Sequence, residues 1–287
     1  MVFDRRLIRL RRDRAARTIA DHGFLFDAAA ERLADRLSDM RRAFAVAAEI
    51  GSRAGALARA LVGTDRVATL IQTDMSVAGL VGLAGPRVAL DEEALPFAPA
   101  SLDAILSSLA LHEVNDLPGA LAQMRRALKP DGLLLVSLLG GETLAELRAA
   151  VAEAEAATIG GASPRVAPFA DAAALGGLLQ RAGFALPVVD TDVITVAYTE
   201  PLRLLADLKG MGAGNALAMR RRAPMRRATL AAIAEALARR CADPSGRIIT
   251  RFEIVTLTAW APAASQPKAR PCGSATVPLG RALGTEE

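Results

Sequence analysis

Residues Ala43–Gly55 read AFAVAAEIGSRAG: an apolar run, an acid at Glu49, and two glycines, Gly51 and Gly55, ahead of a helical segment. A buried strand that leads into a glycine turn and then a helix is the typical opening of a nucleotide-binding α/β unit. The turn needs glycine because a bare backbone can adopt positive φ and approach a ligand closely. Arg53 occupies a position of the turn where a small residue is expected. The stretch therefore predicts a nucleotide-type site with one altered position.

The composition indicates a globular chain with a sizeable core. The chain has 287 residues, of which 52% are hydrophobic, enough for one large α/β domain or two small ones. Its formal net charge is +4, and only 3% of its residues are aromatic. Nucleic-acid binding favours a basic stripe with interleaved aromatic side chains, so no nucleic-acid partner is expected.

Several sequence features favour a cytoplasmic location. No apolar run approaches the roughly 20 residues that span a bilayer, and no apolar segment of a signal peptide follows the first charges. The arginine-rich start resembles a mitochondrial presequence in charge, but Asp4 and Asp13 interrupt it. Cys241 and Cys272 form neither a disulfide framework nor a metal-binding spacing, which favours a reducing compartment.

Apolar runs alternate with helical segments over most of the chain. Strands are predicted at 43–50, 66–72, 88–90, 102–107, 133–138, 188–198 and 248–261. Helices are predicted at 56–62, 117–128, 143–157, 175–182 and within 201–240. This rhythm predicts an α/β fold with a mostly parallel sheet and helices on both faces.

The two ends of the chain differ from this core. Residues 1–40 are predicted to form a helical extension, 41–262 the main domain with a helical insertion at about 200–245, and 263–287 an extended tail. In the extension, residues 3–20 place Phe3, Leu7 and Leu10 at helical spacing, with arginines on the other faces. We expect a solvated amphipathic helix here; the alternative is a basic contact surface for an acidic protein or anionic lipid.

Acidic residues follow the predicted strands. Glu49 ends the first strand, Asp74 the second and Asp91 the third. Ligands of open α/β sheets bind outside the carboxyl ends of the strands, so these acids are expected at one edge. Asp74 follows Glu49 at about the separation along the sequence that is typical of an acid that binds a ribose. A carboxylate suits this role because it can accept hydrogen bonds from both ribose hydroxyls. Asp91 could accept one from the exocyclic amine of a base.

The chain resembles the class I S-adenosylmethionine-dependent methyltransferases. The resemblance lies in EIGSRAG (49–55), TDMS (73–76) and the block 91–141, which contains LPF, LD, SSLALH and LKPDG in that order. It implies a Rossmann-like, mostly parallel seven-stranded sheet with an antiparallel last strand, and S-adenosylmethionine as cofactor. The order of the motifs is typical of the branch with ubiquinone, menaquinone and biotin-pathway enzymes. The LPF and LKPDG blocks fit this family better than a nicotinamide dehydrogenase.

The ends of the chain resemble one family more closely, the methyltransferase-fold assembly factors of respiratory complex I. The matching pieces are FDRRLIRLRRDRAA, GGASPRVAPF, VDTDVITVAY, DLKGMGAGNA and ARPCGSATVPLG. That family is linked to hydroxylation of an arginine on a complex I subunit. The resemblance implies such a subunit as protein substrate, a peripheral contact with the inner membrane, and the mitochondrial matrix as location in a eukaryote. Small-molecule O- or C-methylation and assembly without catalysis remain the alternatives.

The resemblance also implies roles for individual residues. Glu49, Gly51 and Gly55 would frame the methionine part of the cofactor, Asp74 the ribose, and Asp91 with Glu92 the adenine, while Ser107, Ser108 and His112 would line the mouth. The complete set expected to bind the cofactor is Glu49, Gly51, Ser52, Arg53, Gly55, Asp74, Met75, Asp91, Glu92, Ser107 and Ser108.

Two positions depart from the pattern of the family. Arg53 replaces the second glycine, and Glu113 replaces an aromatic residue. Arg53 could bind the carboxylate of the cofactor, or it could fill the space that the ligand needs, and we favour impaired or altered binding.

Histidine is scarce in this chain. His112 is the candidate catalytic base, with a role in orienting the strand-end loop as the alternative. His22 is the only other histidine and lies outside the sheet region, so no metal site is expected.

Overall fold

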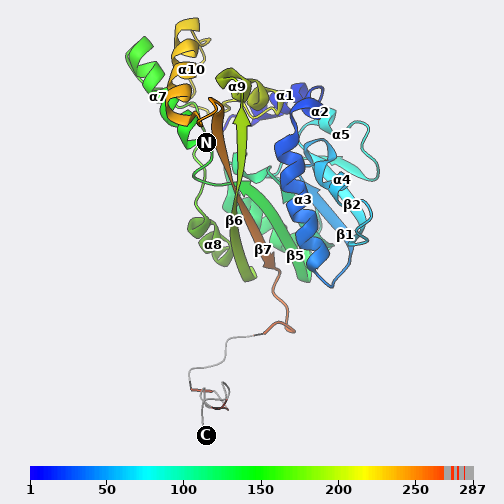
Figure 1. The fold of residues 1–287 in the computed structure, drawn as a ribbon. Helices are drawn as coiled ribbons and strands as arrows, with labels where there is room; N and C mark the ends of the chain where they lie inside the picture. The colour runs from blue at the N-terminus through cyan, green and yellow to red at the C-terminus, as the bar shows by residue number, and fades with distance from the viewer. Residues whose placement is uncertain (268–272, 275–276, 278–280, 282–287) are drawn as a thin grey trace.

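The computed structural model describes residues 1–267, 273–274, 277 and 281, and shows one sheet with helices on both faces (Figure 1). The strands are β1 (Phe44–Ile50), β2 (Val67–Asp74), β3 (Arg87–Ala89), β4 (Leu102–Ser108), β5 (Leu128–Leu139), β6 (Ala185–Tyr198) and β7 (Ile248–Trp260). Their order across the sheet is β3-β2-β1-β4-β5-β7-β6. The pairs among β1 to β5 are parallel, and β7 is antiparallel to both of its neighbours. The predicted fold class is thereby confirmed.

Most helices lie close to their predicted positions, but the short helix at 77–80 is not among the predicted ones. The helices are α1 (Arg5–Ala15), α2 (Ile19–His22), α3 (Phe24–Asp39), α4 (Ala56–Ala60), α5 (Val77–Leu80), α6 (Leu117–Ala127), α7 (Ala145–Ile159), α8 (Ala172–Arg181), α9 (Pro201–Gly210) and α10 (Arg227–Cys241), with short 3-10 helices η1 (Arg53–Gly55) and η2 (Leu111–Glu113). Acidic caps begin several of them: Asp116 accepts a hydrogen bond from Gly119 N and Asp171 from Ala174 N. None of the helices in the described part of the chain is long and apolar enough to cross a membrane.

The core has two parts, one on each face of the sheet. Neighbouring residues of β4 point to opposite faces, so Leu106 packs with α3, α4, α7, α9 and α10, whereas Ile105 packs with α6 and α8. Both strand residues are fully buried. Because β1 and β4 are covered on both sides, the site at their carboxyl ends rests on a rigid base.

Two segments refine the sequence predictions. Strand β5 begins at Leu128, earlier than the expected Leu133, and Asp131 marks the turn of the LKPDG segment with φ 61°. Helices α9 and α10 lie between β6 and β7 in the chain. Most of the predicted tail at 263–287 lies outside the described residues.

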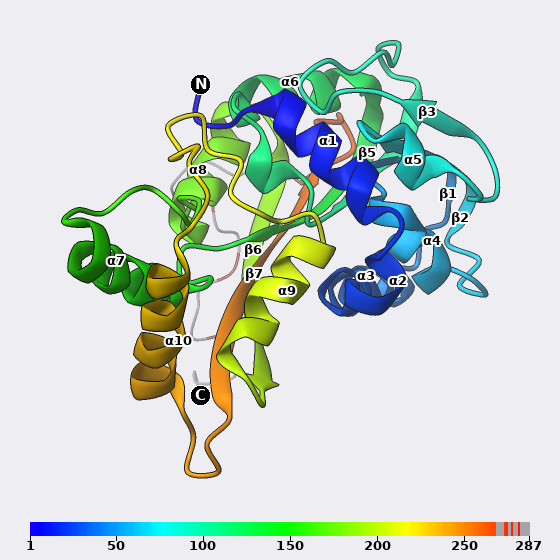
Figure 2. The ribbon, with the colours of Figure 1, turned by 90° about the horizontal axis from the view of Figure 1, so that it is seen from above.

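The carboxyl ends of the parallel strands meet at one edge of the sheet, and α1 lies over this edge (Figure 2). The start of the chain is fixed there by backbone contacts. Val2 N and Phe3 N each donate to Asn115 Oδ1 at 2.8 Å, and Asp4 N donates to Ala216 O at 2.8 Å. Asp4 also caps α1 by accepting a hydrogen bond from Leu7 N.

Candidate functional site

The turn after β1 brings the backbone close to the neighbouring loop. Gly51 and Gly55 have φ of 75° and 77°, in the left-handed region that glycine tolerates. A Cβ on Gly51 would lie 2.2 Å from the Cβ of Ala110, so only glycine fits between the turn and the segment after β4. Ser52 N donates to Thr73 O at 2.7 Å, which ties the turn to the end of β2. Both predicted glycines thus occupy positions that require glycine.

Glu49 is a buried acid without a partner. Its side chain is fully buried at the end of β1, and neither carboxylate oxygen has a hydrogen-bond partner among the described residues. Burial raises its pKa well above the ordinary value, and the nearby charge of Asp74 adds to this. The side chain is therefore held as a neutral carboxylic acid, or it receives donors from a ligand.

Asp74, in contrast, is fully engaged. Its Oδ2 accepts a hydrogen bond from Arg53 N at 3.1 Å, and its Oδ1 accepts one from Ser76 N at 2.9 Å. The guanidinium of Arg12 also lies 3.5 Å from Oδ1. The carboxylate predicted to bind a ribose is thus occupied by the chain itself.

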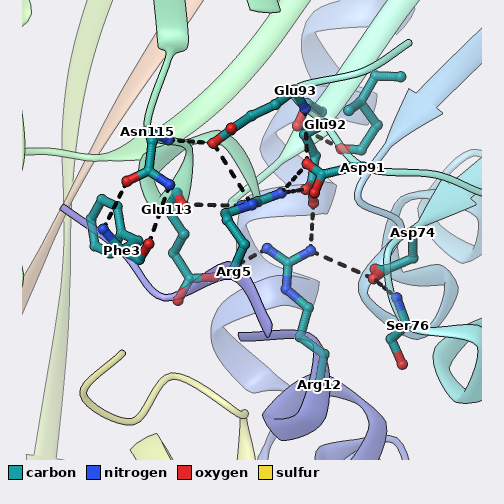
Figure 3. A network of polar contacts seen from close by, with 12 residues as sticks. Phe3, Arg5, Arg12, Asp74, Ser76, Asp91, Glu92, Glu93, Glu113 and Asn115 are labelled. Atoms are coloured by element: carbon teal, nitrogen blue, oxygen red, sulfur yellow. Dashed lines mark hydrogen bonds and ion pairs between the residues drawn. The ribbon is translucent and has the colours of Figure 1, made fainter. Parts of the chain in front are cut away.

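Two arginines of α1 reach the acids at this edge of the sheet (Figure 3). Arg5 pairs with Asp91, at 2.6 Å, and with Glu92. Arg12 pairs with Glu92 at 2.5 Å and with Glu113 at 3.1 Å. Burial alone would raise the pKa of Glu92, but the charges of Arg12 and Arg5 lower it below its usual value. The buried Glu92 is thus stabilised as a carboxylate by the two arginines of α1.

The expected pattern of α1 is wrong in one respect. Arginines were expected on solvated faces, but the side chains of Arg5 and Arg12 are only 12% and 3% exposed. Ile8 lies between them on the buried face, whereas Leu10 of the expected apolar stripe is 44% exposed. The spacing Arg5, Ile8, Arg12 follows one helix face and was the available signal. The spacing alone does not predict burial, because charged residues on a helix ordinarily lie in solvent.

Arg53 points toward Glu113. Its Nη2 lies 3.0 Å from Glu113 Oε2 and donates to Leu109 O at 3.3 Å, and its guanidinium lies 5.0 Å from the ring centroid of Phe26. Its backbone is strained, with φ 45°. Burial alone would raise the pKa of Glu113, but the charges of Arg53 and Arg12 lower it to about 2. The two positions that depart from the family pattern are thus partners of each other.

His112 lies on the other side of Glu113, in η2. Burial lowers its pKa to about 4, so the imidazole is neutral near pH 7. Its ring meets Phe169 edge-on at 5.8 Å between centroids, and its Nδ1 has no hydrogen-bond partner among the described residues. A neutral imidazole with a free nitrogen can exchange a hydrogen bond with a ligand.

The remaining predicted residues have mixed surroundings. Ser107 Oγ donates to Ile50 O at 2.7 Å and so supports the end of β1. The hydroxyls of Ser52 and Ser108 are buried and have no partner within the described chain. Met75 packs under α1 in a small apolar cluster with Ile8. The structure brings the predicted residues to one edge, but α1 covers part of them.

Two of the cavities beside this network are lined by its acids, one by Glu113 and the other by Asp74. The larger has a volume of about 260 Å³ and mostly apolar walls, with Arg53, His112 and Glu113 among its polar lining residues. The smaller, between Arg12 and Asp74, measures about 20 Å³. A cavity of that size holds about one water molecule. In the described chain, no group of three or more His, Cys, Asp or Glu residues is arranged to hold a metal ion.

Comparison with known sequences places the chain among methyltransferase-fold proteins. Residues 48–136 match the model of a family described as "Methyltransferase domain". The mitochondrial arginine-hydroxylase NDUFAF5 of Mus musculus is 38% identical over 286 residues, which cover 97% of this chain and 83% of that protein. The same protein of Danio rerio is 36% identical, with coverage of 96% and 88%. The malonyl-[acyl-carrier protein] O-methyltransferase of Laribacter hongkongensis is 36% identical, with 91% coverage of each.

Solved structures share the fold. A putative methyltransferase from Bacillus halodurans aligns with a TM-score of 0.55 at 14% identity, covering 81% of this chain and 99% of its own. The YcgJ protein of a Bacillus species aligns with a TM-score of 0.56 at 16% identity, covering 81% and 98%. At such identities the likeness concerns the fold alone.

Proposed function

Since the chain belongs to the class I S-adenosylmethionine-dependent methyltransferase-fold family that includes the NDUFAF5 arginine-hydroxylases, we propose that it is an enzyme of respiratory complex I assembly. We propose further that it binds S-adenosylmethionine and modifies an arginine of a complex I subunit. Modification of an arginine is supported by the extent of the match: relatives named arginine-hydroxylase align with 96–97% of the chain, far beyond the methyltransferase domain at 48–136.

The cofactor assignment is supported by the chemistry of the strand ends. Glu49 offers a buried carboxyl group that has no hydrogen-bond partner in the part of the chain that the structure describes, and Asp74 follows at the end of the next strand. The turn from Gly51 to Gly55 presents bare backbone beside them. These residues would hold the amino-acid and ribose parts of the cofactor, which supplies a transferable methyl group when bound.

The space, however, does not fit the cofactor while α1 is in place. The cavity beside Asp74 holds about one water molecule, and Arg12 and Arg5 fill the surroundings of Glu92 and Asp91. A nucleoside needs many times that volume. The fold therefore offers the donors and acceptors of the cofactor site, whereas the conformation described here closes it.

The acceptor is proposed to enter the larger cavity. Glu113 lines this cavity and is the acid that a guanidinium would contact there, and His112 lies beside it. Because the imidazole is neutral near pH 7, it can take a proton from the acceptor. Its low pKa makes it a weak base, so its main contribution is expected to be orientation of the acceptor.

Two other functions rest on specific observations. The mostly apolar walls of the larger cavity suit a small, apolar acceptor, and the match to malonyl-[acyl-carrier protein] O-methyltransferases supports methylation of a small molecule or acyl group. The engagement of Asp74, Glu92 and Glu113 by arginines of the chain suits an assembly factor without catalysis.

Deletion of the protein tests these three functions. We expect loss of assembled complex I, measured by native gel and NADH oxidation, together with loss of a mass increment on one subunit arginine. That increment, of a methyl group or an oxygen atom, is read by mass spectrometry. Normal complex I with loss of a quinone or biotin would instead establish the small-molecule function.

Complementation with His112→Ala separates enzyme from assembly factor. The variant is expected to restore the protein level but not the modified arginine, whereas the exposed control Glu31→Gln restores both. If the wild-type strain assembles complex I but carries no modified arginine, assembly needs no catalysis. The proposed location, cytoplasmic with contact to the inner membrane, or matrix in a eukaryote, is read from fractionation in the same strains.

A further inference from the structure

The contacts of α1 with the acids of the sheet edge point to a second role for this helix. We propose that Arg5 and Arg12 compete with the cofactor for Asp74, Asp91 and Glu92, so that α1 is a gate that closes the nucleoside part of the site. This inference rests on the cofactor assignment proposed above. It concerns which residues must move before a ligand can bind.

The first support is that every acid in question is already neutralised from within the chain. Arg12 contacts Asp74 and Glu92, and Arg5 contacts Asp91 and Glu92. Two guanidinium groups therefore supply the hydrogen-bond donors that ribose hydroxyls and a base amine would otherwise supply. The arginines thus occupy acceptor sites of these carboxylates that a nucleoside would otherwise use.

The space beside Asp74 is also too small for a nucleoside. The space between Arg12 and Asp74 is about 20 Å³, and its walls include Ala15 and Ile19 from the end of α1 and the start of α2. Retracting the side chain of Arg12 alone would leave these walls in place. Entry of a nucleoside therefore requires the helix backbone to move.

Helix α1 is attached in a way that allows such a movement. Its apolar support is small, since Ile8 packs in a cluster of only five buried residues with Met75, Leu217, Phe3 and Ala216. Most of its remaining contacts are polar: the ion pairs, the hydrogen bond from Ser76 Oγ to Asp13 at 2.7 Å, and the strap of residues 2–4. Such contacts separate at a modest net cost only if both partners are then solvated or bound by a ligand, as they would be once the helix has moved away from the acids.

Arg12 also connects the two parts of the site. It contacts Glu92 on the cofactor side and Glu113 on the wall of the larger cavity. Departure of α1 would therefore free Glu113 from one of its two arginines at the moment the cofactor space opens. The gate would then expose an acid for the acceptor together with the acids for the cofactor.

Removal of one arginine tests the competition, because the proposal predicts that affinity for the cofactor rises and not falls. If Arg12 competes with the cofactor, Arg12→Gln should bind S-adenosylhomocysteine about tenfold more tightly than the wild type, which corresponds to about 1.4 kcal/mol. Binding is measured by titration calorimetry on the full chain. Arg14→Gln is the matched control, because Arg14 lies on the same helix but is exposed. Unchanged or weaker binding by Arg12→Gln would overturn the competition.

Arg5→Gln covers the case in which loss of Arg12 unfolds the protein. Glu92 keeps its contact with Arg12 in this variant, and Asp91, which loses Arg5, has a side chain that is 40% exposed, so the fold should persist. Tighter binding is again expected, with Arg9→Gln as the exposed control on the same helix. Thermal unfolding of each variant shows whether the fold is retained.

A reversible lock tests the movement itself. Asp13→Cys with Ser76→Cys places thiols on two side chains that now contact each other at 2.7 Å, in a background with Cys241→Ala and Cys272→Ser. The oxidised protein should lose binding of S-adenosylhomocysteine at least tenfold, and reductant should restore it. The single-cysteine variants should not respond to oxidant.

The outcomes separate this inference from the proposed cofactor. Equal binding by the oxidised and reduced forms would overturn the gate and leave the cofactor assignment intact. No binding in the reduced form, in Arg5→Gln or in Arg12→Gln would overturn the cofactor assignment, and the gate with it.

Discussion

The guanidinium of Arg53 lies 3.0 Å from the carboxylate of Glu113, so the two positions that depart from the family pattern form one buried ion pair. Arg53 makes this contact from a strained backbone conformation with φ 45°. Its Nη2 donates hydrogen bonds to Glu113 and to the carbonyl of Leu109, so this nitrogen is not free to bind a cofactor. The arginine in the turn is thus explained by a partner 60 residues further along the chain.

Replacement of Arg53 by glycine should destabilise the protein. Loss of one partner of a buried ion pair costs about 3–5 kcal/mol, and relief of the positive φ returns about 1 kcal/mol. We therefore expect Arg53→Gly to lower the free energy of unfolding by about 3 kcal/mol, measured by urea denaturation. Ala54→Gly is the matched control in the same turn, with φ 58°, and should stay within about 1 kcal/mol of the wild type. Equal stability of the two variants would contradict the role given to the ion pair.

Glu49→Gln should change how stability depends on pH. The pKa of Glu49 is raised in the folded state, so the folded protein holds a proton that the unfolded chain releases above about pH 4.5. The wild type should therefore lose stability relative to Glu49→Gln as the pH rises from about 4.5 toward the raised pKa. Thermal unfolding of both proteins between about pH 5 and pH 8 gives the two profiles. Parallel profiles would show that Glu49 is ionised in the fold.

His112 should remain neutral under mildly acidic conditions. Burial lowers its pKa to about 4, so its imidazole should show the nitrogen shifts of a neutral ring at about pH 5.5. Two-dimensional NMR of protein labelled with ¹⁵N-histidine reads these shifts directly, and His112→Asn assigns the signal. Protonation with an ordinary histidine pKa would mean that the ring is solvated and does not line a closed cavity.

Gly51→Ala should be far more damaging than an alanine at a comparable glycine. The new Cβ would lie 2.2 Å from the Cβ of Ala110 and would also strain a backbone with φ 75°. Overpacking and strain together predict a loss of about 2–4 kcal/mol. Gly63→Ala has a similar φ of 81° but nothing within 4 Å, so it should cost only about 1 kcal/mol. The difference between the two, measured by urea denaturation, isolates the close approach of the turn to the segment after β4.

Much of the site could be predicted because its signals are local. The strand at 43–50, the glycine turn and the acids at Glu49, Asp74 and Asp91 follow from short apolar runs and from the residues that end them. Once the strands are parallel, their carboxyl ends must meet at one edge, so the acids could be placed together. The structure agrees at each of these positions.

Burial of Arg5 and Arg12 could not be predicted in the same way. Helical periodicity shows that the two residues share a face, but it does not show what lies opposite that face. The carboxylates that they contact are 62 to 101 residues away in the chain. A buried arginine is stable only because carboxylates compensate for the water it loses, and those carboxylates come together only when the sheet has formed.

The sequence by itself therefore determined the order and type of the elements, the parallel sheet and the row of acids along its edge, because these depend on residue patterns within short segments. Only the tertiary structure decided how those acids are used. It placed α1 over the edge, paired Arg12 with Glu92 and Glu113, and turned Arg53 toward Glu113. Charge pairing in a buried site depends on which side chains meet in space, and that is fixed by packing across the whole domain.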